Sequence, residues 1–332
     1  MRTKKEKYFI ITIDTEGDNI WHRVTTRSGM RDINVKNAEY IERFQKLCER
    51  FHFIPTYLVD YEMANAEVFI SQAKEWLAEK KCEIGMHMHA WNTPPIYELP
   101  FNAKGHNPFA GEYPRYILWK KIRFMTEYLE DTFGTRPVSH RGGRWYVDPW
   151  YIQALMRLGY ISDCSITSGV SWSGTIGNKE YGPDYSHFSP DVFCFERKFI
   201  NASMENSMEI RRIVEIPPTI ISPSLKTKAY EALKRPGLIK TINKEKIWLR
   251  PTGSNLEEML YIVKRTRKRE YIEFVLHSSE LMPGGSPTFK TRQSIEKLYQ
   301  DLEILFSEIA IERTGISLSD YTKLLKNKKV DN

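Results

Sequence analysis

The stretch Tyr8-Phe9-Ile10-Ile11-Thr12-Ile13-Asp14 is a short run of apolar and β-branched residues that closes on a carboxylate. Such a run is typical of a buried strand. The pattern returns at 53–59 (FIPTYLV) and at 82–89 (CEIGMHMH), and segments with helical spacing of apolar residues separate the three strands. This alternation predicts a parallel sheet, either open or closed into a barrel.

The alternation continues beyond the third strand. Helices are expected near 116–133, 150–158, 255–269 and 294–313, and strands near 137–141, 160–166 and 272–277. Between Thr167 and Arg250 the pattern weakens, and this stretch is expected to be a loop-rich insertion with strands at 213–216 and 247–249. Because no internal repeat or low-complexity linker divides the sequence, a single domain over 1–332 is expected.

Composition excludes several classes of protein. The 49 Lys and Arg against 42 Asp and Glu give a net charge of +7, and 41% of the residues are hydrophobic, which excludes a disordered chain. No apolar run approaches the roughly 20 residues of a transmembrane helix, and no secretory signal is recognised. The four cysteines form no CxxC pair, so a cytoplasmic protein with reduced thiols is expected. The basic runs at 2–7, 264–269 and 326–329 lack interleaved aromatic residues, which argues against nucleic-acid binding.

Polar residues at the strand ends carry the chemistry. Side chains two apart in a strand share a face, so Asp14 lies beside Glu16 and His87 lies beside His89. Two imidazoles near two carboxylates form a site for a divalent metal. The second acid of this site is Glu16 or Asp18. The alternative is a turn with solvated acids and two histidines that play only structural roles.

Three further motifs follow in chain order. Arg141 and Arg144 flank a pair of glycines at a strand end, where the backbone can approach a ligand closely. Asp163 falls within the expected strand at 160–166, and His277 ends the last strand before a loop rich in turn residues. Strand ends of one parallel sheet are where active sites of this architecture lie.

The ordered set resembles the five motifs of the polysaccharide deacetylases, carbohydrate esterase family 4. The motifs are TIDTEG at 12–17, EIGMHMH at 83–89, HRGGRW at 140–145, ISD at 161–163 and VLH at 275–277, the last followed by SSELMPGG. The resemblance covers about residues 8–280. It implies an α/β fold, a distorted (β/α)7 barrel, and metal-dependent removal of acetyl groups from N-acetylated sugars.

The resemblance also implies roles for individual residues. Asp14 corresponds to the general base, Glu16 to an acidic metal ligand, and His87 and His89 to the remaining ligands. The sequence departs from the family in two places: Thr15 stands where a second aspartate is usual, and four residues beyond His87 stands Trp91 instead of a histidine. The ligand set therefore rests on His89 as a substitute.

Amide hydrolysis needs the functions that these residues supply. Zn²⁺ is the metal expected first, with Co²⁺, Ni²⁺, Fe²⁺ or Mn²⁺ compatible with the same ligands. Asp14 is expected to accept a proton from water, with Arg141 orienting it and holding it ionised. His277, oriented by Asp163, is expected to protonate the departing nitrogen.

The expected substrate is an N-acetylated amino sugar in a glycan or glycolipid precursor of cell-surface polysaccharide biosynthesis. Trp145, Trp91 and Arg144 are expected to bind it, since aromatic faces stack on sugar rings. Trp172 lies beside the same loops and is a further candidate for this aromatic surface. A catalytically inactive carbohydrate-binding relative and a metal-independent glycoside hydrolase are the alternative functions. Neither the sugar, nor its acetylated position, nor the oligomeric state follows from the sequence.

Overall fold

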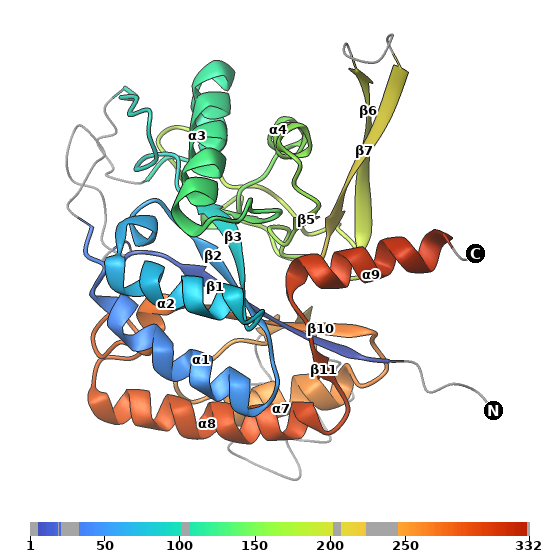
Figure 1. The fold of residues 1–332 in the computed structure, drawn as a ribbon. Coiled ribbons are helices and arrows are strands. Elements are labelled where there is room, and N and C mark those ends of the chain that lie inside the picture. Colours follow the sequence, from blue (N-terminus) through green and yellow to red (C-terminus); the bar gives the residue numbers. More distant parts are fainter. Residues whose placement is uncertain are drawn as a thin grey trace.

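The computed structural model describes residues 6–18, 20, 33–100, 107–201, 207–223 and 245–330 (Figure 1). Most of the basic run at 2–7, and 224–244 of the expected insertion, lie outside the described residues. The strands are β1 (Tyr8–Thr15), β2 (Pro55–Val59), β3 (Glu83–Met88), β4 (Ser139–Gly142), β5 (Ser162–Asp163), β6 (Phe193–Asn201), β7 (Ser207–Glu215), β8 (Ile220–Ile221), β9 (Ile247–Trp248), β10 (Tyr271–His277) and β11 (Thr314–Gly315).

The α-helices are α1 (Ile41–Arg50), α2 (Glu67–Ala78), α3 (Arg115–Phe133), α4 (Pro149–Leu158), α7 (Leu256–Arg265), α8 (Arg292–Ala310) and α9 (Leu318–Val330). Short 3-10 helices are η1 (Lys36–Tyr40), η2 (Met63–Asn65), η3 (Ala110–Glu112), η4 (Gly143–Trp145) and η6 (Ser278–Leu281). Local signals set several of these ends. The carboxylate of Asp148 accepts the backbone N–H of Tyr151 at the start of α4, and Gly159 ends that helix in the left-handed region.

The strands form one curled sheet in the order β10-β1-β2-β3-β4-β5-β7-β6. From β10 to β7 every neighbouring pair is parallel, and only β6 runs antiparallel to its neighbour. Beyond β10, the N–H of Val275 donates to Leu249 O and the N–H of Thr219 donates to Glu273 O, so segments next to β8 and β9 continue the curl. The expected distorted (β/α)7 barrel is confirmed.

Helices pack around the outside of the curled sheet (Figure 1). Every residue of β1 is buried, as a central parallel strand covered on both faces requires. Phe306 of α8 is fully buried and lies edge-on to the rings of Phe9, Phe53 and Phe274. This aromatic cluster fixes α8 against β1, β2 and β10.

The expected loop-rich insertion contains more regular structure than its sequence indicates. β6 and β7 form a long ribbon that projects from the body (Figure 1), and β7 is also a strand of the parallel sheet. β6 escaped prediction because it alternates aromatic and charged residues at an exposed edge instead of forming an apolar run. α9 was also missed, because its second half is rich in lysine. The single domain over 1–332 stays a prediction.

Among the described residues, no helix combines the length and apolar character that spanning a membrane requires.

Truncation of Phe306 to Ala is expected to lower the free energy of unfolding by about 3–5 kcal/mol, because a fully buried ring is lost from the aromatic cluster. Urea unfolding measures this change. Ile304→Ala on the same helix is the matched control, since Ile304 is 49% exposed and its truncation should change the free energy by less than about 0.5 kcal/mol. Equal effects of the two variants would contradict the packing described for α8.

Candidate active site

The carboxyl ends of the parallel strands bring the polar motifs together. Asp14 of β1 lies opposite His277 of β10 in the register, and His87 of β3 lies opposite Arg141 of β4. All four side chains are buried. Residues separated by more than a hundred positions in the sequence therefore meet at one edge of the sheet, as the strand-end motifs predict.

Glu16, His87 and His89 form a compact group of potential metal ligands. One ligand atom from each lies within 4.8 Å of the others, and all three residues are buried. Glu16 Oε2 lies 2.9 Å from His89 Nε2 and 3.3 Å from His87 Nε2. Burial raises the pKa of Glu16, but the hydrogen bonds to His87 and His89 outweigh burial and hold that pKa well below its usual range.

The surroundings of this group fit a divalent cation. His87 Nδ1 lies 3.0 Å from the carbonyl oxygen of Arg141, and donation to that oxygen leaves Nε2 free to bind a metal. The backbone of Glu16 is held on both sides, since its N–H donates to Ser278 Oγ and its carbonyl accepts from Asn37 Nδ2. Two imidazole nitrogens and one carboxylate are a ligand set that zinc accepts, with positions left for water and substrate.

Two details explain how the site departs from the usual motifs. Gly143 packs so closely on His89 that a Cβ there would lie 2.5 Å from His89 Nδ1, so the glycine allows the start of η4 to approach this ring. Trp91 packs against His89 with the ring centroids 4.3 Å apart and the ring planes tilted by 45°, so it supports this histidine instead of supplying a ligand. Asp18, the alternative acid, accepts the N–H of Lys36 and stands outside the ligand group.

Asp14 is held by a fully buried arginine. Arg141 Nη1 lies 2.6 Å from Asp14 Oδ1, while Arg141 Nη2 lies 2.5 Å from Glu273 Oε1 and 2.6 Å from Thr12 Oγ1. Burial favours a raised pKa for Asp14, but the charge of Arg141, aided by His87 and His277, lowers it. Asp14 is thus kept as the anion that a general base requires.

Glu273 responds in the opposite direction. Its burial outweighs the attraction of Arg141 and raises its pKa to about 7. Its Oε2 atom is buried and finds no hydrogen-bond partner among the described residues. Arg141 therefore keeps Asp14, which lines a cavity, ionised. Glu273, the other acid beside Arg141, stays partly protonated near neutral pH.

His277 faces both the base and the metal group. Its Nε2 lies 3.5 Å from Asp14 Oδ2 and 3.9 Å from Glu16 Oε1, and its Nδ1 lies 3.3 Å from Glu280 Oε2. The backbone N–H of His277 also donates to Glu280 Oε2. Burial disfavours the imidazolium, but the hydrogen bond with Glu280 and the negative charges of Glu16, Glu280 and Asp14 together outweigh burial and raise the pKa of His277.

The expected role of Asp163 needs correction. Asp163 Oδ1 lies 2.6 Å from Nδ1 of His140 and accepts a hydrogen bond from Ser165. His140 and Arg141 are consecutive in β4 and point to opposite faces, and Asp163 lies beside His140 in the register. The carboxylate against Nδ1 of His277 belongs instead to Glu280, three residues further along the chain.

A cavity of about 350 Å³ opens above these groups. Trp91, Trp145 and Trp172 contribute to its wall, together with Arg144 and Arg250. Of these five residues, the sequence pointed to the three tryptophans and Arg144 but not to Arg250, which ends the insertion whose path the sequence does not define.

Arg144 and Trp145 adopt unusual backbone conformations at the cavity wall. Both have positive φ values, 56° and 60°, which side chains with a Cβ rarely adopt. The ring of Trp145 lies over the guanidinium of Arg141 at 4.8 Å, and that of Phe109 lies over the guanidinium of Arg144 at 3.9 Å. Such local strain clusters at binding and catalytic sites.

Comparison with known proteins supports the fold and leaves the activity open. No protein-family model and no curated protein matches the chain. A crystal structure of a Mycobacterium smegmatis protein assigned as a polysaccharide deacetylase matches it with a TM-score of 0.58 at 13% identity, over 99% of this chain and 93% of that one. The chain has the fold of a polysaccharide deacetylase.

Two other solved structures share this fold. The allantoinase Puue matches with a TM-score of 0.52 at 12% identity, over 97% of this chain and 91% of that one. A 4-alpha-glucanotransferase from Thermococcus litoralis matches with a TM-score of 0.50 at 11% identity, over 96% of this chain and 40% of that one. Because these names denote different activities, the fold alone does not select a substrate.

Replacing Glu16, His87 or His89 singly by Ala is expected to abolish stoichiometric zinc binding, because each removes one of three ligands. Isothermal titration with Zn²⁺ and elemental analysis measure the change. His187→Ala is the matched control, since His187 is exposed and should leave binding intact. Wild-type protein that takes up no divalent metal would contradict the assignment.

Glu273→Gln is expected to change how stability depends on pH. The unfolded chain ionises this carboxyl near pH 4.5, whereas the folded chain ionises it near pH 7, so its contribution to the free energy of unfolding falls as pH rises through this window. The loss is on the order of 3 kcal/mol. Urea unfolding between pH 4.5 and 8 should show the free energy of unfolding of the variant rising by this amount relative to that of the wild type. Parallel plots of the two free energies against pH would contradict the raised pKa.

Proposed function

We propose that the protein is a metal-dependent hydrolase that removes the acetyl group from an N-acetylated amino sugar in a glycan or glycolipid precursor. The observation that carries the proposal is that two functional groups of residues line one cavity. One is the possible metal site of Glu16, His87 and His89, and the other is the pair formed by Asp14 and His277. An amide hydrolase needs a site of each kind.

A divalent cation held by Glu16, His87 and His89 would polarise the acetyl carbonyl and lower the pKa of a water molecule to roughly 7. The protein supplies the proton transfers. Asp14 Oδ1 is occupied by Arg141, which leaves Oδ2 to accept a proton from the attacking water. The hydrogen bond to Arg141 fixes the carboxylate plane and keeps it ionised.

His277, whose Nε2 lies 3.5 Å from Asp14 Oδ2, serves as the general acid. Its Nε2 donates a proton to the nitrogen of the sugar as the carbon–nitrogen bond breaks, so that the products are acetate and a free amine. Glu280 holds the ring through Nδ1 and stabilises its protonated form. Trp145 and Trp91 offer aromatic faces to the sugar ring at the cavity wall.

The two rival functions make different demands on the same residues. A glycosidase acting through Asp14 and Glu16 would need no metal, yet Glu16 lies against two histidine rings. An inactive binding protein would need neither a base held by a buried arginine nor an acid beside it. Metal content and acetate release separate all three functions.

The zinc-loaded protein is expected to release acetate from an N-acetylated sugar, and Asp14→Asn is expected to lower kcat by about 10²–10⁴-fold because the base is lost. A coupled acetate assay on N-acetylglucosamine, its oligomers and its phosphorylated derivatives measures this, with Asp191→Asn, an exposed acid, as the control. The zinc content of Asp14→Asn should equal that of the wild type. Fully loaded protein that releases no acetate from any of these compounds would overturn the proposal.

A further inference from the structure

Arg250 lines the same cavity as Asp14 and His277 but has no part in the reaction described above. It follows β9, and its backbone is fixed: its N–H donates to Trp248 O and its carbonyl accepts from Asn255 Nδ2. The position of the guanidinium at the cavity wall is therefore set by a well-anchored segment.

The guanidinium has more donors than the protein uses. Of its five N–H groups, one on Nη2 donates to Glu280 Oε1 at 3.0 Å. Nε is buried and has no hydrogen-bond partner in the part of the chain that the structure describes. Leaving a buried donor unpaired is unfavourable unless a ligand accepts from it. The side chain keeps 26% of its surface exposed, so a ligand in the cavity can reach it.

The charge of Arg250 is only partly balanced. Glu280 divides its carboxylate between Arg250 through Oε1 and the ring and backbone of His277 through Oε2. Arg144, the other guanidinium of the cavity, donates to two backbone carbonyls, which carry no net charge. This wall of the cavity therefore holds two guanidinium groups, and the only carboxylate that pairs with either among the described residues is the shared one of Glu280.

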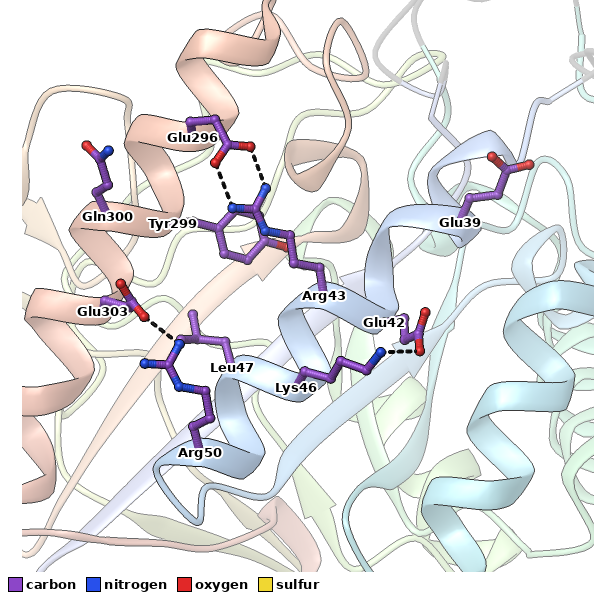
Figure 2. A pocket seen from close by; sticks show the side chains of 10 residues that line it. All are labelled: Glu39, Glu42, Arg43, Lys46, Leu47, Arg50, Glu296, Tyr299, Gln300 and Glu303. Atoms are coloured by element: carbon purple, nitrogen blue, oxygen red, sulfur yellow. Dashed lines mark hydrogen bonds and ion pairs between the residues drawn. The ribbon is translucent and has the colours of Figure 1, made fainter.

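The groove between α1 and α8 shows the opposite arrangement. This hollow of about 520 Å³ is also lined by cations, but Figure 2 shows each of them facing an acid. Arg43 forms two hydrogen bonds with Glu296, and Lys46 pairs with Glu42. The groove therefore offers no surplus positive charge to a ligand, in contrast to the cavity wall at Arg250.

We propose that Arg250 binds a negatively charged group, a phosphate or a carboxylate, carried by the substrate beside its N-acetylated ring. A guanidinium suits both groups, because its planar N–H donors match their oxygens. This inference rests on the proposed deacetylase function and narrows its substrate to an acidic or phosphorylated N-acetyl sugar.

The test compares acetate release by the zinc-loaded protein from N-acetylglucosamine, N-acetylglucosamine 1-phosphate and N-acetylmuramic acid. At least one charged compound is expected to have a kcat/KM at least 10-fold above that of the neutral sugar. Arg250→Gln should raise KM for that compound about 10–100-fold and change KM for the neutral sugar less than 3-fold. The two charged compounds separate a phosphate from a carboxylate.

Two controls separate ligand binding from an indirect effect through Glu280. Glu280→Gln should lower kcat for neutral and charged compounds alike, because it acts on His277, and should not reduce the preference for the charged compound, because Arg250 is retained. Arg43→Gln, which removes a paired surface arginine, should change neither kcat nor the preference between neutral and charged compounds. A preference for the neutral sugar, or an Arg250→Gln variant that behaves as Glu280→Gln does, would overturn the proposal.

A binding measurement decides the inference even where no acetate is released and the proposed function fails. Isothermal titration of the zinc-loaded wild type with inorganic phosphate and with N-acetylmuramic acid should detect binding of at least one, weakened 10-fold or more by Arg250→Gln. Any anion bound at the metal contributes equally to both proteins. Binding of neither compound, or equal affinities in the two proteins, would overturn the role of Arg250.

Discussion

The buried guanidinium of Arg141 is the interaction on which the rest of the site depends. It joins β4 to β1 through Asp14 and to β10 through Glu273, and it has no solvent exposure. Burial disfavours its charge, but the attraction of Asp14, with smaller contributions from Cys164 and Glu273, outweighs burial and raises the pKa of Arg141. Removing one partner of such a group leaves an uncompensated buried charge and destabilises a protein by about 3–5 kcal/mol. The same backbone residue also orients a potential metal ligand, because the carbonyl of Arg141 faces Nδ1 of His87.

Placing one cation beside two acids separates their proton affinities. Asp14 lies near His87 and His277 as well as Arg141, and its pKa falls. Glu273 lies deeper, with one oxygen unpaired among the described residues, and its pKa rises. Asp14, the base of the proposed reaction, is thus kept ionised. The carboxyl that retains a proton near neutral pH is that of Glu273, which has no role in the proposed reaction.

The sequence predicted the fold and most of the site because both follow from short-range periodicity. Buried strands that end in polar residues must bring those residues to one edge of a parallel sheet, and the structure places Asp14, Glu16, His87 and His277 there. Periodicity alone left open whether the sheet closes into a barrel, and the resemblance to the deacetylase motifs supplied that expectation. The long-range partners could not be predicted in this way. Glu280 was overlooked although it lies three residues from His277, since its role was assigned to Asp163, an acid within another predicted strand.

What the sequence missed comes from segments without a clear period. Arg250 ends the insertion, and only the three-dimensional path of the chain shows that it reaches the cavity. The central claim is that Glu16, His87 and His89 hold a catalytic metal, and anomalous diffraction at the zinc edge from crystals of the zinc-loaded protein tests it most directly. A single strong peak bounded by Glu16 and the Nε2 atoms of His87 and His89 is the predicted result. A peak elsewhere, or none at this position, would contradict the claim.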